Sequence, residues 1–252
     1  MARIIAVTNQ KGGVGKTTTA VNLAAQLAGP KRRVVVVDLD PQGNATSSLG
    51  VDKERLPKTL YDVVVSDAQA VDIVLPTGVE NLFLLPTNNR LAQAEVDLVP
   101  VARREFRLRD ALAGVDADLI VIDCPPALGL LTINALAAAT DVLIPVQAEY
   151  FALEGLGQLL QTIQAVKQSL NPPLDILGVV MTMFDKRMSL SEQVRAEVAQ
   201  HFGDKLLKTV VPRNVRLAEA PSYGRTIFEH DKWSKGARAY KALATEVAKR
   251  IS

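Results

Sequence analysis

Residues 11–18 read Lys-Gly-Gly-Val-Gly-Lys-Thr-Thr, a glycine-rich run that ends in a lysine and two hydroxyl side chains. Glycine lets the backbone adopt positive φ and approach a ligand without a Cβ in the way. The run follows an apolar segment and precedes a helical pattern, an arrangement that points backbone amides and a helix N-terminus at a phosphate. The predicted nucleotide-binding residues are Lys11, Gly12, Gly13, Val14, Gly15, Lys16, Thr17 and Thr18.

Within this loop, Lys16 is expected to reach the β- and γ-phosphates, and the Thr17 hydroxyl is expected to bind Mg²⁺. The run departs from the common pattern G-x-x-x-x-G-K-[ST], because Gln10 stands where the first glycine belongs and an additional Lys11 follows it. One lysine suffices for the phosphates of a nucleotide in its own loop. Lys11 therefore either has another role or is a solvated loop lysine.

Three aspartates follow apolar runs. Asp123 ends the run 119–122, and Asp38 and Asp40 follow the run 34–37. A carboxylate at such a position can hold Mg²⁺ through its waters, although an aspartate there is also a common helix cap or turn former. Next to a phosphate loop, the metal role is favoured for Asp123, and the predicted metal ligands at this point are Thr17 and Asp123.

Four segments carry a resemblance to a known family: residues 11–18, Val-Asp-Leu-Asp-Pro-Gln-Gly-Asn at 37–44, Ile-Asp-Cys-Pro-Pro at 122–126, and the stretch 212–222. Together they resemble the ParA/MinD group of deviant-Walker ATPases. The last segment, Pro-Arg-Asn-Val-Arg-Leu-Ala-Glu-Ala-Pro-Ser, resembles the chromosomal ParA (Soj) branch. The motifs occur in the family's order and span nearly the whole chain.

The resemblance implies an ATPase that requires ATP and Mg²⁺ and forms a homodimer when ATP is bound. It assigns catalytic roles to Lys11, Lys16 and Asp40, with Asp40 orienting the attacking water. It also places Asp38 close to the metal and adds this residue to the predicted metal ligands. Lys11 would contact the phosphates of the partner's nucleotide, as an arginine finger does in other NTPases. Gly12 would then permit the close approach of two loops in an isologous interface.

The same resemblance places Met181, Pro212 and Asn214 around the purine base. Asn214 would supply an amide, although an asparagine after Pro-Arg is also an ordinary loop residue.

The net charge of +2 conceals an asymmetry. Residues 186–252 hold 14 Lys and Arg against 7 Asp and Glu, whereas residues 1–185 hold 15 against 20. A basic C-terminal third indicates a surface for a polyanion, or else scattered solvated charge. By resemblance Arg187 and Arg216 contact DNA, and other basic residues could extend the patch: Lys186, Arg213, Lys232, Lys235 and Arg238. No recognition helix is evident, so binding should be phosphate-directed and sequence-independent.

Predicted strands and helices alternate along the chain, and they position these residues. Strands are predicted at 3–8, 34–37, 81–85, 119–122, 142–146, 176–183 and 207–211, and helices at 17–28, 91–113, 129–138, 153–169, 189–201 and 235–250. Most strand runs are continuously apolar, as in a parallel sheet covered on both faces. The fold class is therefore α/β, a doubly wound and mostly parallel sheet with ligands at the carboxyl ends of its strands.

We expect one domain over residues 1–252, without an N-terminal helix-turn-helix domain. No run of eighteen apolar residues is present, and the lone Cys124 suits a reducing cytosol. The predicted protein is a cytoplasmic, nucleoid-associated partitioning ATPase that is stimulated by a ParB/Spo0J-type centromere binder and is not inserted in a membrane. Two alternatives remain: a MinD-like regulator that cycles on membranes, and an ATP-dependent synthetase on the same fold.

Overall fold

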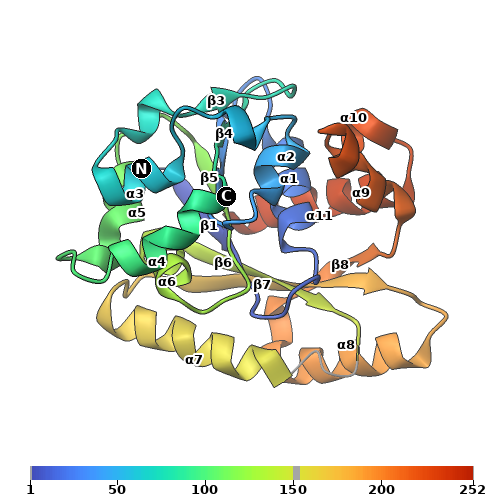
Figure 1. The fold of residues 1–252 in the computed structure, drawn as a ribbon. Helices are drawn as coiled ribbons and strands as arrows, with labels where there is room; N and C mark the ends of the chain where they lie inside the picture. The colour runs from blue at the N-terminus through green and yellow to red at the C-terminus, as the bar shows by residue number, and fades with distance from the viewer. Residues whose placement is uncertain (1, 150–153, 252) are drawn as a thin grey trace.

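A computed structural model describes residues 2–149 and 154–251. Its centre is one eight-stranded sheet with the order β3-β4-β2-β5-β1-β6-β7-β8, in which only β3 runs antiparallel to its neighbour (Figure 1). The strands are β1 (Arg3–Val7), β2 (Val34–Asp38), β3 (Leu75–Pro76), β4 (Leu82–Leu85), β5 (Leu119–Asp123), β6 (Asp141–Gln147), β7 (Asp175–Phe184) and β8 (Leu206–Pro212). The predicted α/β class and all seven predicted strands are confirmed, with only small shifts at the strand ends.

The strands are apolar throughout because both faces of the sheet are covered. In β2, Val34 and Val36 belong to one buried cluster, and Val35 and Val37 belong to the cluster on the opposite face. All five β2 residues are buried. A continuous apolar run is what this environment requires, since neither face has water to favour polar side chains.

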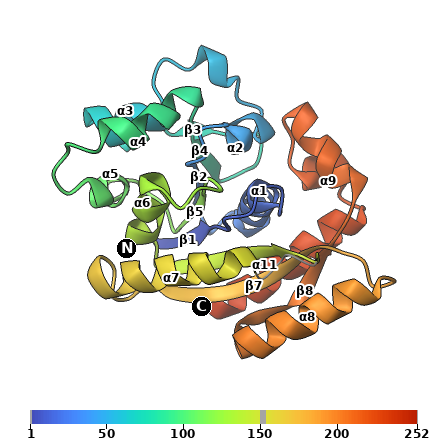
Figure 2. The ribbon, with the colours of Figure 1, turned by 60° about the horizontal axis from the view of Figure 1, so that its bottom comes forward.

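Helices cover both faces of the sheet (Figures 1 and 2). The α-helices are α1 (Lys16–Leu27), α2 (Asn44–Ser48), α3 (Leu60–Ser66), α4 (Ala94–Asp97), α5 (Arg107–Leu112), α6 (Leu130–Ala138), α7 (Glu154–Ser169), α8 (Ser189–Phe202), α9 (Val215–Glu219), α10 (Ile227–Asp231) and α11 (Lys235–Ile251). Helices α1 and α11 pack together on one face, and α5, α6, α7 and α8 pack on the other. Five of the six predicted helices are confirmed. Residue 153, the predicted start of α7, lies outside the described residues.

The strand order determines where a ligand can approach. From the central β1, the chain crosses to β2 on one side and later to β6 on the other. The chain therefore leaves the centre of the sheet toward opposite sides, and the strand order reverses at β1. Open α/β sheets bind their ligands at the carboxyl ends of the strands at such a point. The loop 11–18 follows directly from this end.

The predicted helix over 91–113 is wrong. The structure has a 3-10 turn at Asn89–Gln93, the single turn α4, a second 3-10 turn at Arg104–Phe106 and then α5. Pro100 lies in the break, where proline lacks the amide donor that a helix needs and its ring blocks the preceding turn. Arg103 also has a φ of 56°, which no α-helix tolerates. The short elements α2, α3, α9, α10 and β3 were not predicted.

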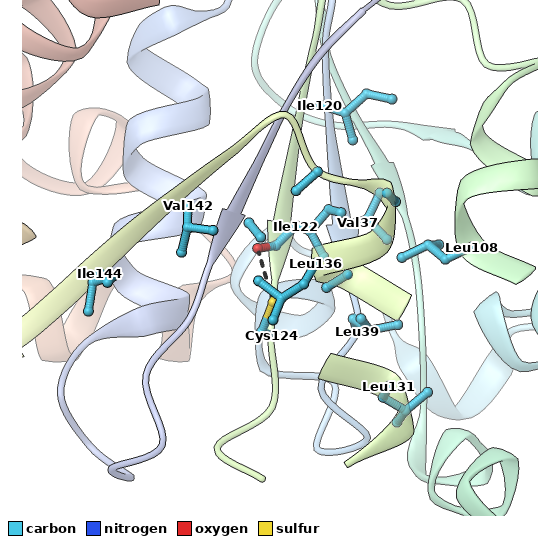
Figure 3. Packing of buried hydrophobic residues seen from close by; sticks show 14 of the residues in the cluster. Val37, Leu39, Leu108, Ile120, Ile122, Cys124, Leu131, Leu136, Val142 and Ile144 are labelled. Carbon is cyan, nitrogen blue, oxygen red and sulfur yellow. Dashed lines mark hydrogen bonds between the residues drawn. The ribbon is translucent and has the colours of Figure 1, made fainter. Parts of the chain in front are cut away.

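Figure 3 shows the larger buried cluster where it meets β5. Cys124 lies among Ile122, Leu136 and their neighbours, and its thiol points to the Ile122 carbonyl at 3.9 Å. Burial raises the pKa of this thiol, and the nearby Asp123 raises it further. The only cysteine of the chain is thus a packed core residue.

The interrupted segment is tied to α6 by one buried amide. Asn134 accepts a hydrogen bond from Leu108 N at 3.1 Å and donates to the carbonyls of Arg104 (2.9 Å) and Leu130 (3.0 Å). These bonds satisfy backbone groups that a continuous helix would have satisfied by itself.

Replacing this amide should be costly. We expect Asn134→Ala to lower the free energy of unfolding by about 2 kcal/mol, because buried backbone groups lose their partners. Urea unfolding with an unchanged m-value would measure this loss. Gln164→Ala, on the exposed side of α7, serves as a control with an expected change below about 0.5 kcal/mol. An equally small change at Asn134 would show that water replaces the amide.

Candidate nucleotide and DNA site

The glycine-rich loop has the backbone that its sequence requires. Gly13 and Gly15 have φ of 76° and 89°, and α1 begins immediately afterwards at Lys16. The Lys16 side chain is buried inside the loop, where its Nζ donates to the Lys11 carbonyl at 3.0 Å. Burial lowers the pKa of Lys16, while the charges of Asp123 and Asp40 oppose this shift. The ammonium thus lies at the centre of the loop, close to the predicted metal ligand Asp123 and the predicted catalytic residue Asp40.

Two side chains from neighbouring strands hold the loop in place. Asn9 donates to the Pro145 carbonyl of β6 at 2.7 Å and accepts from Lys11 N at 3.1 Å. Thr182 of β7 donates from Oγ1 to the Val14 carbonyl at 2.8 Å. Both contacts join the loop to strands that follow it by more than 130 residues, and we did not expect either from the sequence.

Asp38 and Asp123 are brought together by the parallel register. They are paired residues at the carboxyl ends of β2 and β5, and both are fully buried. Asp38 Oδ2 accepts two hydrogen bonds of 2.7 Å from the amide and hydroxyl of Thr46 in α2. Asp38 Oδ1 and both oxygens of Asp123 have no hydrogen bond of normal geometry among the described residues.

Both of these paired carboxyl groups have a raised pKa. Burial, followed by the charge of Asp38, raises the pKa of Asp123 well above its usual range. Burial also raises the pKa of Asp38, although the two hydrogen bonds from Thr46 limit the increase. Unpartnered buried carboxylate oxygens beside a second carboxylate are a chemical environment that a cation can compensate.

The residues fit Mg²⁺ with ligands from outside the protein. Among the described residues, no three His, Cys, Asp or Glu side chains form a complete ligand set. Mg²⁺ commonly binds through one or two carboxylates together with substrate phosphates and water. Thr17, Asp38 and Asp123 therefore suit a metal that arrives with a nucleotide. Asp40 lies two residues further along, nearly buried, and its Oδ1 accepts from Gln42 N at 3.0 Å.

A cavity of about 260 Å³ opens beside α1 between β7, β8 and α9. We call it the base cavity; its lining includes Gly15, Thr18, Thr182, Met183, Pro212 and Asn214. Asn214 Oδ1 is buried and has no hydrogen-bond partner among the described residues. The lining also includes the polar side chains of Thr18, Thr182 and Arg213, so the cavity combines apolar walls with a few polar groups, as ligand cavities usually do.

The prediction for Met181 needs correction. Its side chain is fully buried in the core and does not line the base cavity, whereas Met183 does. The β7–β8 pairing shifts register on both sides of Met181, and Met183 has a φ of 50°. This irregular backbone decides which methionine lines the cavity, and period-two reasoning along a strand cannot reveal it.

The second lysine of the loop has a different environment from the first. Lys11 Nζ lies 3.2 Å from Glu149 Oε2, and both side chains are partly exposed. Gly12 is exposed beside it, and no atom lies within 4 Å of the position that a Cβ would take there. The chain itself therefore gives no steric reason for glycine at position 12.

A groove of about 800 Å³ lies between the end of β7, the end of β8 and the first turns of α11. We call it the basic groove, after Lys186, Arg187, Arg213, Lys235 and Arg238 that line it. Arg187 is 90% exposed and forms a forked pair with Asp185 at 2.7 and 3.0 Å. These contacts raise the pKa of Arg187 and lower that of Asp185 to about 2.

Two predicted DNA-contacting residues lie outside this groove. Arg216 on α9 contacts Glu219 at 2.8 Å and Asp231 at 3.6 Å. Lys232 lies between α10 and α11 with its Nζ 5.3 Å from the centre of the Trp233 ring. The structure thus gathers five of the basic residues in the groove and places Arg216 and Lys232 on the adjacent surface of α9 and α10.

Comparison with known proteins finds a matching family and relatives that are similar over nearly the whole chain. The AAA domain family matches residues 2–176. Sporulation initiation inhibitor protein Soj of Bacillus subtilis is 56% identical over 250 residues, which is 98% of this chain and 99% of that protein. Chromosome partitioning protein ParA of Myxococcus xanthus is 52% identical, over 99% of this chain and 89% of that protein.

A solved structure named cobyrinic acid a,c-diamide synthase from Mycobacterium smegmatis, with bound ADP and magnesium, is also similar. It is 41% identical, has a TM-score of 0.87, and covers 100% of this chain and 96% of its own.

The unpartnered carboxylate leads to a stability prediction. We expect Asp123→Asn to raise the thermal midpoint of the chain in EDTA by about 3 °C, the shift that about 1 kcal/mol produces at this size. The reason is that the substitution removes a buried charge that lies beside another of the same sign. Differential scanning calorimetry would measure it, with the exposed Asp116→Asn as control. A lowered midpoint would mean that the carboxylate stabilises the metal-free chain.

Proposed function

Because the chain belongs to the family of ParA and Soj chromosome-partitioning ATPases, we propose that it segregates DNA through a nucleotide-switched dimer. ATP binding closes two protomers face to face, the dimer binds DNA without sequence preference, and hydrolysis releases it. The observation that carries this proposal is the contrast between two lysines of one loop. Lys16 is buried in its own site, whereas Lys11 lies at the exposed rim next to an unobstructed Gly12.

The nucleotide is ATP with Mg²⁺, and each part of the site receives one part of it. The loop amides and Lys16 hold the phosphates, and the base cavity takes the adenine. Adenine presents an exocyclic amine where guanine presents a carbonyl. The unpaired Asn214 Oδ1 favours a donor of this kind. Mg²⁺, held by Thr17, Asp38 and Asp123, would neutralise charge that develops on the phosphates.

Hydrolysis needs positioning more than covalent chemistry, because the phosphoryl group passes through a loose transition state. Asp40 orients the attacking water and accepts its proton in this proposal, which is supported by the hydrogen bond from Gln42 N that holds its carboxylate. Lys16 stabilises the transferred phosphoryl group from within the protomer. Lys11 of the opposite protomer supplies the second positive charge, after it leaves Glu149.

Dimer formation places two basic grooves on one particle. Each exposed arginine contributes little alone, but two linked sites raise the effective concentration of the second contact. ATP thereby controls DNA affinity without moving the groove itself. The contacts are to phosphates, so affinity should fall steeply with salt. A ParB/Spo0J-type centromere binder would stimulate hydrolysis, and the DNA-bound dimer would be associated with the nucleoid.

A second candidate function is an ATP-dependent synthetase. It is favoured by the name of the Mycobacterium smegmatis structure at 41% identity. Such an enzyme must hold a carboxylate substrate against the γ-phosphate. The base cavity, which is lined by Gly15 and Thr18 of the loop, is assigned here to the adenine.

The membrane-cycling alternative receives less support. No helix in the described part of the chain has the length and apolarity to cross a bilayer. The apolar residues of α11, including Tyr240, Leu243 and Val247, are buried against the sheet and α1 rather than available to a lipid surface.

Replacing Asp40 should separate binding from turnover. We expect Asp40→Ala to reduce ATP hydrolysis at least about a hundredfold, because the water loses its orienting base. ATP-dependent dimerisation and DNA binding should persist. Phosphate release and sizing in the presence of ATP would measure the two effects. Asp40→Asn keeps an acceptor for Gln42 N and should be equally inactive; normal turnover in Asp40→Asn would reduce Asp40 to a turn former.

Replacing Gly12 should separate nucleotide binding from dimerisation. A Cβ at position 12 meets no atom within 4 Å apart from those of its chain neighbours, so we expect the ATP affinity of Gly12→Val to stay within about twofold of the original. The added side chain should block the opposing loop, and the protein should remain monomeric with a slowly hydrolysed ATP analogue. Light scattering would show this. Gly114→Val is a matched control, since Gly114 is also exposed and uncrowded. A dimer of Gly12→Val would contradict the face-to-face arrangement.

A further inference from the structure

Trp233 is the only tryptophan of the chain, and it is 78% exposed. It is the most exposed of the large apolar side chains in the described residues. Tryptophan is enriched at interfaces, because its ring offers a large apolar area together with a polar N–H group. None of the motifs in the sequence assigns a role to this residue.

The backbone around Trp233 is firmly held. Trp233 N donates to Asp231 Oδ1 at 3.1 Å, and the following Ser234 accepts from Ala237 N at 3.0 Å at the start of α11. The indole is therefore presented from a fixed turn between α10 and α11, which Figure 1 shows next to α9. A fixed exposed ring loses little freedom when it is covered.

This turn lies between the two basic regions of the surface. On one side, Asp231 is also the 3.6 Å partner of Arg216. On the other side, Lys235 lines the basic groove together with Arg187. Lys232 lies directly over the ring, with its Nζ 5.3 Å from the ring centre. The turn that carries the indole thus lies between Asp231, which contacts Arg216, and Lys235 of the basic groove, and Lys232 is the cation that contacts the ring.

We propose that Trp233 is a nucleic-acid contact, whose ring packs against base or deoxyribose surface while the flanking cations bind phosphates. Nucleic acid is the partner that combines dense negative charge with flat apolar faces. The proposal rests on the DNA binding proposed above and extends it, because it adds an apolar contact to an interface otherwise made of charges. Insertion of apolar side chains between base steps in the minor groove is one way in which duplex DNA accepts such a ring.

This contact has a distinctive physical consequence. Lys and Arg contacts release counterions, so their contribution weakens as salt rises, whereas ring packing releases none. Loss of Trp233 should therefore weaken DNA binding by the same factor at every salt concentration. Loss of a phosphate-binding arginine should instead flatten the salt dependence, by about 1 in slope for each phosphate that is no longer neutralised.

The intrinsic fluorescence of the protein reports on this one ring. With the full chain and a slowly hydrolysed ATP analogue, we expect no large change until DNA is added, and then quenching or a shift of emission. Separate arms with a duplex and with a single-stranded oligonucleotide distinguish groove contact from stacking on free bases. A change with the analogue alone, and none with either nucleic acid, would place Trp233 in the dimer interface and overturn the proposal.

Variants complete the test. We expect Trp233→Ala to lower DNA affinity at least about fivefold at low and high salt alike, with an unchanged logarithmic salt slope and normal ATP-dependent dimerisation. Arg187→Ala should reduce the slope, and Val71→Ala, an exposed apolar side chain in a distant part of the sequence, should change neither quantity. Trp233→Phe should recover part of the affinity.

The two proposals fail in different ways. If the wild-type dimer binds DNA and Trp233→Ala binds it equally well, the tryptophan contact is overturned and the partitioning function stands. In that case, loss of stimulation by a centromere-binding protein would assign the ring to a protein partner. If the wild-type dimer binds no DNA at all, both proposals fall.

Discussion

The parallel pairing of β1, β2 and β5 is the constraint on which the site depends. It aligns Val7, Asp38 and Asp123 at the carboxyl ends of these three strands, so the loop after β1 begins beside two buried carboxylates. Placing two such groups side by side away from water is unfavourable unless a cation compensates them. Thr46 partly supports Asp38, and the buried Lys16 supplies nearby positive charge. In the proposed function, Mg²⁺ that binds together with a polyphosphate supplies the remaining positive charge.

The two loop lysines illustrate how neighbouring residues of one type acquire different roles. Lys16 is buried, and its ammonium is fixed by a carbonyl of the same loop. Lys11 forms a partly exposed ion pair with Glu149, and such pairs contribute only about 0–1 kcal/mol. Exchanging Glu149 for a phosphate therefore costs little. The chain can keep Lys11 ordered while it is alone and still release it when a better anionic partner arrives.

Much of the fold could be predicted from the sequence because its signals are local. Continuous apolar runs such as 119–122 indicate strands covered on both faces, and the carboxylates are found by their position after such runs. The long helix over 91–113 was mispredicted because apolar spacing was given more weight than Pro100. Met183 was missed because the direction of its side chain depends on a register shift between β7 and β8. The Asn9 and Thr182 contacts join distant segments, and only the assembled sheet reveals them.

The burial of Cys124 has a practical consequence for the study of this protein. Only the thiolate form of cysteine reacts readily with thiol reagents, and the core location both blocks access and raises the pKa of this thiol. A cysteine introduced at a surface position would therefore be the sole reactive thiol of the folded chain. Fluorescent labels or crosslinkers can be attached one site at a time, with every native residue of the core left in place.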